Sequence, residues 1–297
     1  MSGGDPLSHG GPRVVAIGGG HGLARTLLAL RRFAGHITAV ASVADDGGSS
    51  GRLREATGLP APGDVRKCLA ALSAPSSVLG AALEHRFSGG GLDGHAFGNL
   101  LLAALAASTG DFVRAVDEAG RLVGAVGRVL PATAVPVVLR AEAAGGELVG
   151  QVAIMGASGV RRVSLLPADA AVPAAVLEAI EAAEAIVIGP GSLFTSVLAA
   201  LAPRETARAL AQARARRVYV SNLREQCPET AGFDVARHVA ALIDHGVVPD
   251  VVVADPSAIA LGEVPPGIRV HAARLASGDG LAHDAGRLAA ALEAAIA

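Results

Sequence analysis

The fold of this chain is set by residues 14–54, which read VVAIGGGHGLARTLLALRRFAGHITAVASVADDGGSSGRLR. Residues 14–17 are a short apolar run that predicts a buried strand, and a glycine loop follows it directly. A helix with leucines on one face and a second strand at residues 36–43 come next. Strand, glycine loop, helix and strand make a βαβ unit, so we expect the sheet to begin parallel.

Three further apolar runs repeat the buried-strand pattern, at residues 186–188, 218–220 and 251–253. Helical stretches lie between them, around residues 204–215 and 234–245. This alternation predicts an α/β protein of Rossmann-like type, with a mostly parallel sheet flanked by helices.

The middle of the chain departs from this alternation. Residues 62–122 show a helical pattern in several pieces, whereas 135–142 and 147–154 predict the two arms of a hairpin. Residues 163–166 predict a further strand, and 173–183 a helix with proline in its first turn. We therefore expect a small helical and hairpin subdomain.

No linker divides the chain, so residues 13–297 are expected to form a single domain after a flexible tail at 1–12. Residues 94–154 are expected to form a subdomain or cap on the main sheet.

Composition excludes some classes of function. The net charge is −2, from 25 basic and 27 acidic residues, which gives no basic surface for nucleic acid. The longest uncharged stretch, at residues 185–203, is broken by a Gly-Pro-Gly turn, so no membrane insertion is expected. The two cysteines, Cys68 and Cys227, show no disulfide framework and no metal-ligand spacing. Free thiols and a polar N-terminus indicate a cytoplasmic protein.

Four polar clusters are expected at the carboxyl ends of strands, where open parallel sheets bind ligands. The first consists of Gly18, Gly19, Gly20, His21 and Gly22. Glycines allow a phosphate to approach the backbone, and the helix that follows offers unpaired N–H groups. Because Leu23 stands where a dinucleotide fingerprint has its third glycine, the loop alone is consistent with either a ligand site or a tight turn.

The second cluster carries acids, hydroxyls and a cation together: Asp45, Asp46, Ser49, Ser50 and Arg52. Paired carboxylates can hold a sugar hydroxyl, bind Mg²⁺ or orient a nucleophile, and arginine can clamp a phosphate. The alternative is a solvated turn that caps a helix, but this mixture exceeds what a turn needs. A metal, if any is bound, would lie at Asp45 and Asp46.

The remaining candidates are weaker. In the third cluster Asp64 either caps a helix or joins Arg66 and Lys67 near the phosphates. The fourth, Gly189, Gly191 and Ser192, is a second glycine loop before a helix and suits an anion. Four other polar residues are expected to contribute: His95, Asn99, Asn222 and Glu229. A lone histidine on a helix is more often structural, so both interpretations of His95 stay open.

Together these segments resemble a known family. GGGHGL (18–23), VADDGGSSGRLR (43–54), PGDVRKCLAAL (62–72), GHAFGNLLLAAL (94–105), GRVLP (127–131), GPGSLFTSVL (189–198) and PETAGF (228–233) occur in the order seen in the gluconeogenesis factors. That family is also called the UDP-N-acetylglucosamine-binding proteins. It belongs to the CofD-like superfamily, which is named for 2-phospho-L-lactate transferase. The resemblance covers residues 13–255.

The resemblance implies a regulatory protein that binds a UDP-sugar, requires no cofactor, and controls cell shape and cell-wall precursors during gluconeogenic growth. It implies partners in cell-wall synthesis or a kinase, and a homo-oligomer. By motif position the two glycine loops would line the nucleotide, with Asp45 and Asp46 at the centre. His21 and Lys67 replace a common threonine and asparagine beside the phosphates.

Two other functions remain to be weighed, and no catalytic residue is assigned. A CofD-like transferase would move a phospholactyl-type group from a nucleotide diphosphate donor, with Mg²⁺ near Asp45 or Asp46. An NAD-dependent oxidoreductase is disfavoured by the broken glycine pattern.

Overall fold

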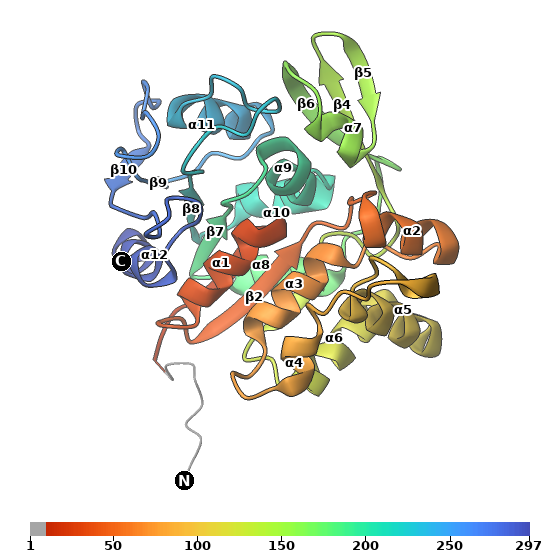
Figure 1. The fold of residues 1–297 in the computed structure, drawn as a ribbon. Helices are drawn as coiled ribbons and strands as arrows, with labels where there is room; N and C mark the ends of the chain where they lie inside the picture. The colour runs from red at the N-terminus through yellow and green to blue at the C-terminus, as the bar shows by residue number, and fades with distance from the viewer. Residues whose placement is uncertain (1–9) are drawn as a thin grey trace.

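A computed structural model describes residues 10–297, so the tail predicted at 1–12 lies mostly outside the described residues. The chain is built around a seven-stranded sheet in the order β10-β9-β8-β7-β1-β2-β3, and every pairing in it is parallel (Figure 1). The strands are β1 (Arg13–Gly18), β2 (His36–Ala41), β3 (Arg128–Pro131), β7 (Ala185–Ile188), β8 (Arg216–Val220), β9 (Val251–Ala254) and β10 (Arg269–Ala272). The predicted α/β class with a parallel sheet is confirmed.

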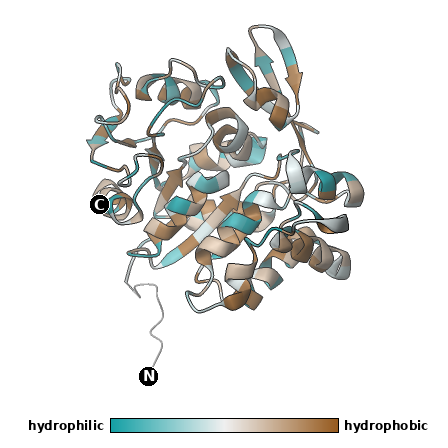
Figure 2. Cartoon of the chain, in the orientation of Figure 1, coloured by the Kyte–Doolittle hydropathy of each residue, from teal (hydrophilic) through white to brown (hydrophobic). Residues whose placement is uncertain are grey.

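The central strands form because their sequences are apolar without interruption. All four residues of β7 and all four of β9 are buried, as expected for strands covered on both faces. In Figure 2 the helices in front of the sheet carry polar as well as apolar segments, which is typical of helices that bury one face. The core therefore lies between the sheet and its two helical layers.

Helix α1 (Gly20–Leu30) lies between α3 (Gly63–Leu72) and α12 (Ala285–Ile296). Helices α8 (Ala174–Ala182) and α9 (Leu198–Leu201) contact β1, and α10 (Arg204–Gln212) packs on α8. Apart from one short helix beside the small sheet, described below, the other helices are α2 (Gly48–Thr57), α4 (Val78–Ala82), η1 (Gly90–Leu92), α5 (Phe97–Thr109), α6 (Phe112–Val123), the π-helix η2 (Leu193–Val197) and α11 (Val235–Asp244). Among residues 10–297 no helix is long and apolar enough to cross a membrane.

A second, antiparallel sheet stands apart from the first, in the order β5-β4-β6 (Figure 1). Its strands are β4 (Val138–Ala143), β5 (Gly146–Val149) and β6 (Val160–Leu166). The predicted hairpin is confirmed, but its second arm was predicted too long, because α7 (Gln151–Met155) begins where the strand was expected to continue. The carboxylate of Asp46 accepts the N–H groups of Gln151 and Val152, at 2.9 and 3.0 Å, and so stabilises that helix start.

Strands β3 and β10 were not predicted, and β2 ends at Ala41 rather than at residue 43. Both missed strands are four residues long and lie at the two edges of the sheet. Every residue of β10 is at least partly exposed, so it lacks the apolar run that marks the central strands.

The order of strands places a switch point between β1 and β7. From β1 the chain builds β2 and β3 on one side, and after returning to β7 it builds β8, β9 and β10 on the other. Connections leave these two neighbouring strands in opposite directions, which opens a crevice at their carboxyl ends. The first and fourth predicted clusters follow β1 and β7, so the fold brings both glycine loops to this crevice.

We predict that Gly22→Ala destabilises the protein by about 1–3 kcal/mol although alanine favours helices, because the added Cβ would collide with the carbonyl group of Pro190. Urea unfolding measures the change. Gly156→Ala is the matched control, since its Cβ would meet only ordinary contacts at 3.7 Å. Equal stability of the two variants would show that the loops do not touch.

Candidate functional site

The two glycine loops form one unit at the switch point. Gly18 lies against Gly189, and Gly22 lies against Pro190 and Gly191. Gly20 and Gly189 have φ values of +63° and +72°, which L-residues with side chains rarely adopt. The hydroxyl of Thr26 donates a buried hydrogen bond of 2.9 Å to the carbonyl oxygen of Gly189. This bond fixes α1 to the second loop.

The second loop is held from behind by Asn222. Its amide accepts from the N–H of Gly191 at 3.0 Å and donates to the carbonyl of the same residue at 2.9 Å. Gln226 donates to the hydroxyl of Ser192 at 3.2 Å. Asn222 and Gln226 therefore fix the loop at the mouth of the crevice.

The carboxylate of Glu229 is hydrogen-bonded to the start of the π-helix η2. Its carboxylate accepts the N–H groups of Phe194 and Thr195, at 2.7 and 3.2 Å, and the Thr195 hydroxyl at 3.0 Å. Burial raises the pKa of the Glu229 carboxyl, while these bonds oppose the shift. The start of η2 is thus capped by the protein itself.

The start of α1 is different. No side chain caps it, and no acidic residue lies in its first turn. A helix start with unpaired N–H groups and a positive dipole end attracts anions. The carboxylate of Asp64 lies against Gly19, just before this helix start, and it is paired with Lys67. No side chain of the described residues accepts the first N–H groups of α1, so of the two glycine loops the first is the one whose N–H groups are left for an anion.

The acids that follow β2 do not act as a pair. Both carboxylate oxygens of Asp46 accept N–H groups at the start of α7, so Asp46 joins the small sheet to the loop after β2. Asp45 accepts the N–H of Gly47 at 3.0 Å and a side-chain hydrogen bond from Ser50. Burial raises the pKa of the Asp45 carboxyl, and the neighbouring charge of Asp64 adds to the shift. Asp64 is thus the acidic neighbour whose charge adds to the raised pKa of Asp45.

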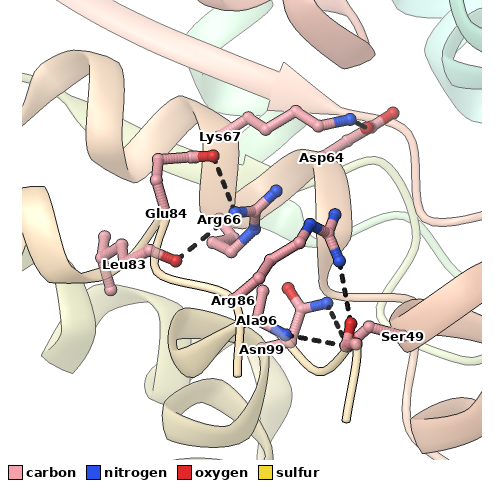
Figure 3. A network of polar contacts seen from close by, with 10 residues as sticks. Ser49, Asp64, Arg66, Lys67, Leu83, Glu84, Arg86, Ala96 and Asn99 are labelled. Carbon is pink, nitrogen blue, oxygen red and sulfur yellow. Dashed lines mark hydrogen bonds and ion pairs between the residues drawn. The ribbon is translucent and has the colours of Figure 1, made fainter. Parts of the chain in front are cut away.

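Asp64 forms an ion pair of 3.0 Å with Lys67, one turn along α3 (Figure 3). Both side chains are largely buried, at 6% and 18% exposed. The pKa of His21 is lowered, first by burial and then by the nearby Lys67 charge. His21 therefore lies near enough to this ion pair for the Lys67 charge to affect its ring.

The predicted phosphate clamps are bound to other protein groups. Arg66 is buried and donates to Glu84 at 2.8 Å (Figure 3). Arg52 donates to the carbonyl of Asp93 at 2.8 Å and to Nε2 of His95 at 3.3 Å. Because Nε2 accepts, the proton of a neutral His95 lies on Nδ1, which is 3.1 Å from the Ser49 hydroxyl.

Asn99 completes this network by donating to the Ser49 hydroxyl at 3.0 Å (Figure 3). The Ser49 hydroxyl oxygen also accepts a hydrogen bond from the N–H of Ala96. This second cluster thus ties α2 to the start of α5, although the buried Oδ1 atom of Asn99 has no hydrogen-bond partner within the described residues.

A hollow of about 350 Å³ opens beside the glycine loops. Of the predicted site residues it contains His21, Gly22, Gly191 and Asn222. Sequence reasoning missed seven others that line it: Arg25, Leu223, Arg224, Gln226, Leu281, Ala282 and His283. Arg25 carried a signal, being four residues after His21 on the same side of α1. The last three carried none, since they come from a distant segment.

A larger hollow of about 620 Å³ lies on α8 and α10, lined by residues such as Glu181 and Arg208. It is formed by helix surfaces rather than strand ends, and none of the predicted residues lines it. Within residues 10–297 no group of three or more His, Cys, Asp or Glu side chains is placed to hold a metal ion. Cys68 is buried and Cys227 exposed, and both are free thiols as predicted.

The comparisons with known proteins agree with this fold. The profile of the family described as 2-phospho-L-lactate transferase CofD matches residues 14–267. The gluconeogenesis factor of Halalkalibacterium halodurans is 45% identical over 81% of this chain and 76% of its own length. A putative gluconeogenesis factor of Mycobacterium tuberculosis is 42% identical over 96% of this chain and 90% of its own.

A relative from Nostoc is also 45% identical, but the chain spans only 52% of its length. A crystal structure of a UPF0052 family member from Bacillus halodurans superposes with a TM-score of 0.90 and 37% identity, covering 97% of this chain and 99% of that one. The chain belongs to the CofD family, and its relatives within that family are gluconeogenesis factors. The resemblance seen in the motifs is confirmed.

We predict that Glu229→Leu destabilises the fold by about 3 kcal/mol, since it leaves two buried N–H groups and a hydroxyl without an acceptor. Glu293→Leu, at an exposed position of α12, is the control and is expected to change stability by less than about 0.5 kcal/mol. Chemical denaturation compares the two, and a small loss for Glu229→Leu would contradict its role as a cap.

Proposed function

We propose that this chain is a regulatory gluconeogenesis factor that binds a UDP-sugar of the UDP-N-acetylglucosamine type in the hollow between β1 and β7. The observation that carries the proposal is the coincidence of this hollow with the switch point and with the uncapped start of α1. Its role would be the control of cell shape and cell-wall precursors in the cytoplasm during gluconeogenic growth.

The diphosphate would lie at the first glycine loop. Gly22 and Gly191 line the hollow without side chains, so the backbone can approach phosphate oxygens closely. Arg224 lines the same hollow and makes no hydrogen bond or ion pair with any residue of the described chain. Its guanidinium is therefore available for a bidentate contact with a phosphate. Arg25 adds a second positive charge.

The rest of the ligand would meet a mixed surface. Pro190, Leu223 and Leu281 supply apolar contacts, and Gln226 and His283 supply polar groups. A volume of about 350 Å³ lies within the range of small-ligand sites. A nucleoside fits such a surface, because its base has apolar faces and polar edges.

We predict micromolar binding of UDP-N-acetylglucosamine by isothermal titration, with weaker or no binding of GDP-sugars and NAD. Arg224→Ala is expected to weaken binding about 10- to 100-fold, equivalent to the roughly 1.5–3 kcal/mol of a charge-assisted hydrogen bond. Arg208→Ala, which changes the groove on α8 and α10, is the matched control and should bind like the wild type. If neither UDP-sugars nor other nucleotides bind, the proposal is wrong.

The transferase alternative depends on Asp45 and Asp64. Mg²⁺ is usually bound by one or two carboxylates together with substrate phosphates, and these two acids are close enough to act on each other electrostatically. Asp46 does not fit this role, since both of its oxygens hold α7. When bound, Mg²⁺ would neutralise phosphate charge, while Lys67 would hold Asp64 in place.

We predict that Asp45→Asn leaves UDP-sugar binding within about threefold of the wild type, because Asp45 does not line the hollow. The titration is repeated with and without Mg²⁺, and a phospholactyl-type donor is assayed for turnover. Turnover by the wild type that is lost in Asp45→Asn would establish the transferase instead.

A further inference from the structure

The wall of the hollow opposite the glycine loops comes from the C-terminal segment. Leu281, Ala282 and His283 line it, and they lie beyond residue 267, where the family match ends. This part of the site therefore lies outside the segment that the family profile matches.

This segment is rigidly held. The buried carboxylate of Asp255 accepts the N–H groups of Leu275 and Ala276, at 2.7 and 3.2 Å. Ala276 and His283 then pair as an antiparallel bridge, and the N–H of Asp284 bonds the carbonyl of Leu275 at 2.8 Å. His283 is thus placed at the hollow before any ligand arrives.

The chemistry of the His283 ring follows from one contact. Its Nε2 atom lies 3.1 Å from the carbonyl oxygen of Ser221, and a carbonyl can only accept, so Nε2 carries a proton. Burial lowers the pKa of His283 to about 4, so the ring is neutral near pH 7. In a neutral imidazole with a proton on Nε2, the Nδ1 atom is a hydrogen-bond acceptor. Among residues 10–297 no hydrogen bond reaches Nδ1.

The other neutral polar side chains that line the hollow, apart from His21, are already hydrogen-bonded within the protein. The amide of Asn222 is bonded to Gly191, and Gln226 is bonded to Ser192 and Asn222. Arg25 and Arg224 are donors only. His21 lies on the side of the first glycine loop, next to Lys67. Apart from His21, His283 is therefore the one neutral side chain of the described residues lining the hollow whose ring keeps an unbonded acceptor.

We propose that Nδ1 of His283 reads the nucleobase by accepting its ring N–H, which is N3–H in uracil and N1–H in guanine. The inference rests on the proposed nucleotide site and adds the chemistry that selects the base. Cytosine and adenine present a lone pair at the equivalent ring nitrogen, so an acceptor would face an acceptor. A site that bonds a substrate N–H discriminates strongly against analogues that lack it.

The test compares ligands on the unmodified protein by isothermal titration. UDP is expected to bind at least 10-fold more tightly than N3-methyl-UDP, which lacks the N–H, and than CDP. The control ligand 5-methyl-UDP carries its methyl group elsewhere and is expected to bind like UDP. Equal affinity for UDP and N3-methyl-UDP would overturn the inference while leaving the nucleotide site intact.

A variant tests the residue itself. His283→Phe is expected to bind UDP and N3-methyl-UDP equally, whereas His36→Phe, at an exposed position at the start of β2, should keep the wild-type preference. If His283→Phe still binds UDP more tightly than N3-methyl-UDP, His283 is not the residue that accepts the ring N–H of the base. If this variant does not fold, the ligand comparison on the wild type still decides. Binding of GDP but not UDP would support the acceptor and overturn the UDP-sugar proposal, and binding of no nucleotide would overturn both.

Discussion

The structure depends on the contact between the two glycine loops that follow β1 and β7. These strands are neighbours in the sheet although some 170 residues separate them. The loops can meet because Gly22 lacks a side chain, since a Cβ there would collide with the carbonyl group of Pro190. The bond from Thr26 to Gly189 fixes the contact. Helix α1 and Asn222, which contribute to the hollow, are bonded directly to this junction.

The two loops have different electrostatic roles. Glu229 caps η2 after the second loop, and the negative charge it buries there opposes an anion. At the start of α1 no side chain of the described residues accepts the first N–H groups, and the Asp64 carboxylate that lies against Gly19 is paired with Lys67. Arg25 and Arg224 add positive charge at the hollow. An anionic ligand would therefore bind at the first loop, while Pro190 and Gly191 of the second loop form part of the wall of the hollow. Sequence alone showed two similar loops, because the capping carboxylate comes from a segment 35 residues away.

Much of the fold could be predicted because β1, β7, β8 and β9 are continuous apolar runs, which local sequence reveals. The edge strand β10 could not be predicted, because it is short and partly exposed and its only strand partner among residues 10–297 is β9. The start of α7 was predicted as a strand because its stabilising partner, Asp46, lies 105 residues away. Long-range side-chain contacts of this kind override local propensity and have no local signature.

The predicted site was recognised by residue type, but residue type does not tell whether a polar group is free. Arg52, Arg66, Ser49 and Asn99 bond one another or their neighbours, so the polar cluster after β2 mainly holds helices together. Arg224 and His283, which sequence reasoning passed over, retain unused donors and an acceptor at the hollow. The C-terminal wall of the hollow is fixed by its own backbone contacts through Asp255 rather than by the glycine loops. Ligand choice in this fold can therefore change without altering the junction on which the sheet depends.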